Sequence, residues 1–92
     1  MAKYNKSFKD LIEDEDRLIT ILEKNADEIV NQLYITEESS DKNRVQEAEA
    51  RIESLREREK LAKSELKEVR TSMIRYLLRI MERLKYDDAT NG

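Results

Sequence analysis

Four consecutive acidic residues, Glu13-Asp14-Glu15-Asp16, form the densest group of chemically capable side chains in the sequence. In a helix, Asp10, Glu13 and Asp14 would lie near one another, and their carboxylate oxygens could bind a hard cation. The same run falls in the first two turns of an expected helix, where negative charge is stabilised by the helix dipole. We therefore expect these acids to be structural, and we predict no metal site.

The side chains that most enzymes use are missing. The chain has no histidine and no cysteine, so it lacks the commonest general base, the thiol nucleophile and the thiolate ligands of zinc and iron–sulfur sites. Its serines have no base available, and its single glycine, at position 92, cannot form a phosphate-binding loop. We predict that the protein is not an enzyme and that it binds no cofactor and no small-molecule substrate.

Arginines in the second half of the chain could bind phosphates. Arg75, Arg79 and Arg83 repeat at four-residue spacing, and Arg70 precedes them. A basic helix can lie along a nucleic-acid backbone. Glutamates are interleaved with these cations, however, and cations beside an apolar helix row pair chiefly with acids of a neighbouring helix. Nucleic-acid binding through these four arginines is therefore the alternative to a protein-binding role.

Long helices are the elements that must carry these side chains. Of the 92 residues, 42% are charged, none is proline and one is glycine, a composition typical of long helices. A chain of this length makes one small domain, so we predict a single all-α domain over residues 1–92. No apolar run reaches the ~18 residues of a membrane span, and the opening residues lack a secretory signal. We therefore expect a soluble, cytoplasmic protein without membrane contact.

The first predicted helix covers residues 8–34. Ser7 and Asp10 form a capping-box pattern immediately before a periodic apolar run. The run occupies the a and d positions of one heptad frame and is widened on its flanks by Leu11, Leu18 and Val30. The a and d residues are Phe8, Ile12, Ile19, Leu22, Ala26, Ile29 and Leu33. A stripe this wide indicates a helix that packs against a core.

The second predicted helix covers residues 42–85 and has a stricter pattern. Its a and d positions are apolar except at Glu59 and Arg83. They are occupied by Val45, Ala48, Ile52, Leu55, Ala62, Leu66, Val69, Met73, Tyr76 and Ile80. Residues 87–92 are expected to be a flexible tail.

The segment between the two patterns predicts a turn. Residues 36–44 contain no apolar side chain, and the heptad frame shifts across them, so a single straight helix would swing its apolar stripe to another face. We predict a turn at residues 36–41, with Thr36, Ser39 or Ser40 as the N-cap of the second helix. A continuous rod is the alternative.

The unequal lengths of the two helices predict an interface. At ~1.5 Å per residue the first helix would be about 40 Å long and the second about 66 Å, so in an antiparallel hairpin the first would end opposite residue 68. The uncovered segment contains Val69, Met73, Ile74, Tyr76, Leu77, Leu78, Ile80, Met81 and Leu84. Each large side chain left in water forgoes about 1.5–3 kcal/mol of burial free energy. We predict that a second copy covers them, giving a dimeric, coiled-coil helical bundle, and the alternative is another protein that binds this helix in a groove.

Charged residues interrupt the two apolar rows and would have to be paired. If a turn near residue 38 sets opposing residue numbers to a sum of about 76, Glu15 lies beside Arg58 and Lys60, and Glu59 lies beside Arg17. Buried carboxylates are tolerated when a cation faces them. We predict that these five residues form a polar layer that fixes the register of the hairpin.

The charge is divided between the two arms. Residues 1–41 contain five Lys or Arg and eleven Asp or Glu, a balance of −6, whereas residues 42–86 contain thirteen and eight, a balance of +5. Opposite charges favour pairing of the arms with each other. We predict an assembly, scaffold or adaptor protein that binds itself and another protein. The acidic arm also permits a second alternative, an acidic inhibitor that occupies a basic cleft.

Overall fold

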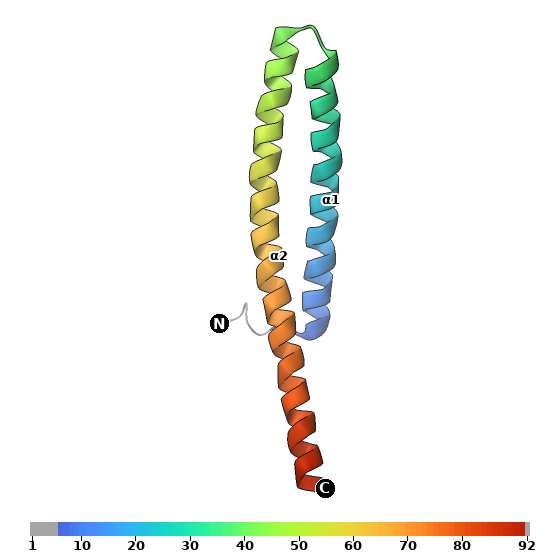
Figure 1. Cartoon of the computed structure of the whole chain (residues 1–92), viewed down its shortest axis with the longest axis vertical. Helices are drawn as coiled ribbons and strands as arrows, with labels where there is room; N and C mark the ends of the chain where they lie inside the picture. The colour runs from blue at the N-terminus through green and yellow to red at the C-terminus, as the bar shows by residue number, and fades with distance from the viewer. Residues whose placement is uncertain (1–5, 92) are drawn as a thin grey trace.

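The computed structural model is an antiparallel pair of helices, and it describes residues 6–91, with side chains through residue 86. Helix α1 spans Phe8–Glu38 and helix α2 spans Lys42–Asn91. The two helices lie side by side, and α2 continues well beyond the start of α1 (Figure 1). The predicted all-α class with two packed helices is confirmed. The molecule is 74 Å long, which matches the ~75 Å expected for the 50 residues of α2 alone.

Helix α1 begins where the capping pattern predicts. The Ser7 hydroxyl oxygen accepts a hydrogen bond from the Asp10 backbone N–H at 3.2 Å, and the Ser7 carbonyl accepts the first helical bond, from Leu11, at 3.1 Å. An N-cap side chain of this kind satisfies a backbone donor that has no partner within the helix. Sequence and structure therefore agree on this terminus.

The connection is shorter than the predicted turn. Helix α1 continues to Glu38, four residues past its predicted end, and residues 39–41 form the whole connection. Thr36 lies inside α1, where its hydroxyl donates to the Leu33 carbonyl at 2.7 Å. Ser39 is the C-cap of α1: its N–H still donates a helical bond to the Ile35 carbonyl, but its own backbone is extended (φ −84°, ψ 136°), which ends the helix. The acidic, apolar-free stretch before residue 39 is thus helical, since it contains no residue that breaks a helix.

The N-cap of α2 is Asp41, which replaces the three predicted candidates. Its carboxylate accepts a hydrogen bond from the Asn43 N–H at 3.0 Å, and its carbonyl accepts from the Val45 N–H. Ser39 supports this cap, since its hydroxyl oxygen accepts from the Asp41 N–H at 3.2 Å. An ionised carboxylate at this position also interacts favourably with the positive end of the helix dipole.

Helix α2 begins at the predicted residue but ends later than predicted. It runs to Asn91, six residues past residue 85. The stretch expected to be a tail is helical through residue 91 because the sequence offers no proline and no glycine before position 92.

The apolar row of α2 forms one side of the core. Its buried members are Ala48, Ile52, Leu55, Ala62 and Leu66. All five occupy predicted a or d positions, and Ala62 and Leu66 form a cluster with Leu18 of α1. The spacing of the row, alternately three and four residues, keeps these side chains on one face of the helix.

The orientation of α1 differs from the prediction. Leu11, Leu18 and Asn25 are buried, while Ile12 and Leu33, which were predicted to face the core, are exposed. At three positions the most buried residue is thus the one before the predicted residue, whereas Ile19 and Leu22 remain partly buried against the core. This rotation lets carboxylates on both edges of α1 reach α2: Glu15 pairs with Arg70 at 2.9 Å and Glu28 with Arg51 at 2.7 Å.

The register of the hairpin also differs from the prediction. The rings of Phe8 and Tyr76 lie 5.2 Å apart at the start of α1, so α1 reaches residue 76 instead of residue 68. The turn is centred on Ser40 instead of residue 38. That shift alone moves the opposing residue by about four positions, since residue numbers across an antiparallel pair have a nearly constant sum.

Candidate functional site

The most unusual surface of the molecule is the end of α2 that α1 does not reach. We call residues 77–91 the tip. The apolar surface on and beside it consists of Ile74, Leu77, Leu78, Ile80, Met81 and Leu84, which are 41–60% exposed. Ile74, Leu77, Met81 and Leu84 are spaced by three, four and three residues, so they lie in one row along the helix. These six side chains therefore make a continuous apolar surface that this chain does not cover.

The solvent-accessible area of the chain supports this description. The chain exposes 7825 Å², whereas a compact monomer of 11.0 kDa would expose about 5,600 Å². The difference between these two areas is larger than the total area that a stable protein–protein interface typically buries, about 1,200–2,000 Å². The elongated hairpin thus has enough surplus surface to form such an interface.

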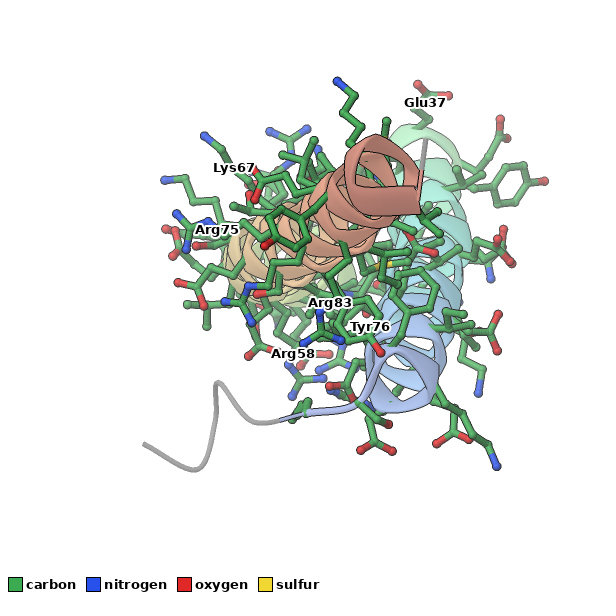
Figure 2. All side chains as sticks on the ribbon, turned by 90° about the horizontal axis from the view of Figure 1, so that it is seen from below. Glu37, Arg58, Lys67, Arg75, Tyr76 and Arg83 are labelled. Carbon is green, nitrogen blue, oxygen red and sulfur yellow. The ribbon has the colours of Figure 1, made fainter. Side chains whose placement is uncertain are left out.

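Three of the nine predicted interface residues pack within the hairpin itself. Val69 packs against the cluster around Leu18, and Met73 is partly buried. Tyr76 stacks against Phe8 in a tilted geometry and points toward the start of α1 in Figure 2. The shifted register explains these differences, because α1 covers α2 for eight residues more than predicted. The other six predicted residues are those of the apolar tip surface.

The predicted phosphate-binding arginines are divided between two environments. Arg70 is engaged in the hairpin through its ion pair with Glu15. Arg75, Arg79 and Arg83 are exposed. Arg75 and Lys67 point away from α1, on the side of α2 opposite Tyr76 (Figure 2). All four arginines are thus exposed, and Arg70 differs from the other three in being paired with an acid of α1.

The predicted polar layer is wrong in its pairing. Glu15 pairs with Arg70, and Glu59 pairs with Lys63 of its own helix at 3.4 Å. Arg17 lies 3.8 Å from Asp14, one turn earlier in α1. The remaining two members of the predicted layer, Arg58 and Lys60, are exposed on α2. The cause is again the register, which brings residue 70 instead of residues 58–60 to the level of Glu15.

Among residues 6–86, two ion pairs join the acidic arm to the basic arm. They are Glu15–Arg70 at 2.9 Å and Glu28–Arg51 at 2.7 Å. All four side chains are more than a quarter exposed, so each pair contributes at most about 1 kcal/mol to stability. Their main effect is on the register and the rotation of α1 relative to α2. They also neutralise part of the difference in charge between the acidic arm and the basic arm.

Asn25 is a core residue that the sequence pattern did not reveal. Its side chain is 8% exposed, and its Nδ2 donor has no hydrogen-bond partner. It follows Leu18 at heptad spacing in the row that α1 buries. The signal was present in the sequence, since Leu11, Leu18 and Asn25 repeat every seven residues, but the neighbouring row of Ile12, Ile19 and Ala26 is more apolar.

An open groove lies at the end of the hairpin where α1 begins. Its volume is about 580 Å³, and the charged residues in its lining are Lys6, Asp14, Arg17, Glu65, Lys67, Glu68 and Arg75. A hydrogen bond from Lys6 lowers the pKa of the Asp14 carboxyl below its ordinary value of 3.8, with further lowering from the charges of Lys6 and Arg17 and an opposing effect of burial. Both signs of charge are present and interleaved, so the groove selects no particular ligand.

Residues 6–86 offer no group of three or more acidic side chains placed to hold a metal ion. Within the described helices, no segment is long and apolar enough to cross a membrane. The chain matches no family model, no curated protein and no solved structure.

Proposed function

We propose that this protein is a non-enzymatic assembly or adaptor protein that self-associates through the tip of α2. The observation that carries the proposal is the apolar tip surface, six large side chains between 41% and 60% exposed at the end of a highly charged chain. A continuous apolar patch of this kind on a small monomer is typical of a protein–protein contact.

A second copy is the first partner that the proposal names, and a dimer with twofold symmetry is the simplest assembly. The row of Ile74, Leu77, Met81 and Leu84 has the three-and-four spacing of coiled-coil contacts, so a helix of the partner would interdigitate with it. Burial of a large apolar side chain contributes about 1.5–3 kcal/mol, and a dimer buries each of these residues twice. An adaptor role would follow if the assembled bundle presents its charged outer faces to another protein.

The experiment is a measurement of mass in solution. Multi-angle light scattering and sedimentation equilibrium of the full chain should give a dimer, and the variant Leu77→Ser/Met81→Ser should give a monomer. Leu61→Ser is the matched control, because Leu61 is 67% exposed on the same helix but outside the tip; it should remain dimeric. Circular dichroism checks that all three proteins stay helical.

A monomeric full chain at every concentration would overturn self-association. A dimer that is equally weakened by Leu61→Ser and by the tip variant would assign the contact to another part of α2. The adaptor role would then need a different surface.

Nucleic-acid binding is a second candidate function, supported by the exposure of Arg75, Arg79 and Arg83 at four-residue spacing. It has less support, because Arg70 is engaged with Glu15 and the whole chain has a net charge of −3. A gel-shift titration at two salt concentrations tests it: a phosphate-binding protein loses affinity steeply as salt rises. Alanine at the three exposed arginines should abolish any such shift.

A further inference from the structure

We propose that the tip of one copy docks on an exposed apolar stripe of α1 of the second copy, reciprocally. This inference rests on the proposed self-association and names the surface that receives the tip. The receiving surface is a mostly exposed row on α1, which combines four residues that were predicted to face α2 with Val30 from the flank of that pattern. It consists of Ile12, Ile19, Ala26, Val30 and Leu33.

The exposure of these residues makes the stripe a second uncovered surface. Val30 is 63% exposed, and Ile12 and Leu33 are both above 40%. Ile19 is partly buried against the core cluster, which joins the stripe to the packed interior. The row has the same alternation of three and four residues as the row on the tip, with its two gaps at positions 16 and 23. Each row is therefore suited to pack against another helix.

Charge complementarity favours contact between the two surfaces. The gaps in the α1 stripe are filled by exposed acids, Asp16 and Glu23. The apolar tip surface is interrupted and followed by exposed cations, Arg83 and Lys85. Over its whole length α1 has three Lys or Arg and ten Asp or Glu, a balance of −7. The whole tip has three Lys or Arg and three Asp or Glu, but residues 77–85 have three cations and one acid. Contact of this part of the tip with the acidic α1 therefore adds electrostatic attraction to apolar burial.

The dimensions of the hairpin allow both contacts to form at once. The tip has 15 residues and is about 22 Å long, while the stripe from residue 12 to residue 33 extends about 32 Å. Each tip starts at the level where α1 of its own chain begins (Figure 1). Two antiparallel hairpins related by a twofold axis can therefore place each tip along the first half of the partner's α1. Each tip then completes a bundle of three helices with α1 and α2 of the second copy.

Contact between two tips explains less. It would leave the α1 stripe exposed in both copies. Docking of the tip on the first half of α1 covers the tip together with the part of the stripe that contains Ile12 and Ile19.

Charge reversal distinguishes the two arrangements. The variants are Asp16→Lys/Glu23→Lys on the stripe, Arg83→Glu/Lys85→Glu on the tip, and the fourfold combination in one chain. Glu13→Lys/Glu38→Lys is the matched control, since both residues are exposed acids of α1 that do not belong to the stripe. Sedimentation equilibrium gives the dimer dissociation constant of each variant, and circular dichroism gives its helicity.

We expect each double reversal to weaken the dimer about tenfold or more, the fourfold combination to restore it to near the wild-type value, and the control to leave it unchanged. If the stripe reversal fails to fold, Asp16→Asn/Glu23→Gln replaces it. This neutral variant should also weaken the dimer, but by less than the charge reversal does. A wild-type dimer that is indifferent to the stripe variants, or a fourfold variant that is no tighter than either double, would overturn docking on α1 while leaving self-association intact. A monomeric wild-type chain would overturn both.

Discussion

The paired part of α2 and its tip belong to one helix but differ in how their apolar side chains are distributed around it. Between residues 42 and 73, within the described chain, Leu61 is the one large apolar side chain of α2 that is strongly exposed. From Ile74 onward, apolar residues occupy most of the circumference. The change occurs near Tyr76, which lies beside Phe8 at the start of α1.

This difference shows that the number of apolar faces on a helix depends on how many neighbours pack against it. A helix paired with one neighbour needs one apolar row, and charge on its other faces keeps the pair in solution. A helix that is apolar on several faces lowers its free energy only when several neighbours surround it. The tip therefore has the composition of a segment inside a larger bundle, although its own chain supplies no neighbour.

The largest effect that would test this comparison is the loss of a core leucine. Leu18 is 2% exposed, so Leu18→Ala should lower the free energy of unfolding by about 2–5 kcal/mol through lost burial and the resulting cavity. Leu78, at 52% exposure, should cost less than about 1 kcal/mol when it is replaced by alanine. Urea unfolding followed by circular dichroism measures both.

The measurement is made in the Leu77→Ser/Met81→Ser background, where association does not contribute to unfolding. Equal costs for Leu18→Ala and Leu78→Ala in that background would show that the tip is packed against its own chain. The distinction between the two regions would then be lost.

The fold was predictable from the sequence to the level of two packed helices and the residues at which they begin. The Ser7 cap and the start of α2 depend on residues that are close in sequence, and both lie where they were predicted. The apolar row of α2 was also predictable, because one row dominates there and no neighbouring row competes with it.

The rotation of α1 and the register could not be predicted, for a physical reason. Two rows of similar apolarity lie side by side on α1, one through Leu11 and Leu18 and the other through Ile12 and Ile19. Their burial free energies differ little, so contacts across the hairpin decide between them. Those contacts, such as Glu28 with Arg51, depend on a turn whose centre was misplaced by two residues. The prediction of an uncovered apolar segment did not depend on this error, because α2 is so much longer than α1 that its end stays unpaired in either register.

A smaller effect is expected at Asn25, the polar residue inside the paired region. Its buried Nδ2 has no partner, and an unsatisfied buried donor costs about 1–3 kcal/mol. Asn25→Leu should therefore raise the free energy of unfolding by an amount in that range, measured by urea denaturation. Asn31→Leu is the matched control, because Asn31 is exposed on the same helix and should change stability little.

A destabilising Asn25→Leu would mean that the amide has a partner in solution, such as an ordered water. A stabilising substitution that also broadens the distribution of oligomers would assign Asn25 the role of a specificity residue, as polar residues in helix rows often have. The paired region would then resemble the tip in using its side chains to select a partner.

The smallest effect concerns the junction between the two regions, where Lys6 and Asp14 pair at the end of the hairpin. Because the hydrogen bond from Lys6 holds the Asp14 pKa below 3.8 in the folded state, the ionised carboxylate stabilises the fold. That stabilisation is fully present above the unfolded pKa and is lost as the pH falls through the folded pKa. Lys6→Met should raise the Asp14 pKa toward its ordinary value, which NMR titration of the side-chain carboxyl measures directly.

Asp14→Asn gives the corresponding stability test. The difference in unfolding free energy between wild type and Asp14→Asn should be constant above about pH 5 and should shrink below the ordinary carboxyl pKa, as the wild-type group becomes protonated. Since the chain has no histidine, no side chain with an ordinary pKa titrates between about pH 5 and 8. A difference that grows as the pH falls would mean that Asp14 is destabilised by its neighbours Glu65 and Glu68 across the groove, and that the junction is held by apolar contacts such as Phe8 with Tyr76 instead of by charge.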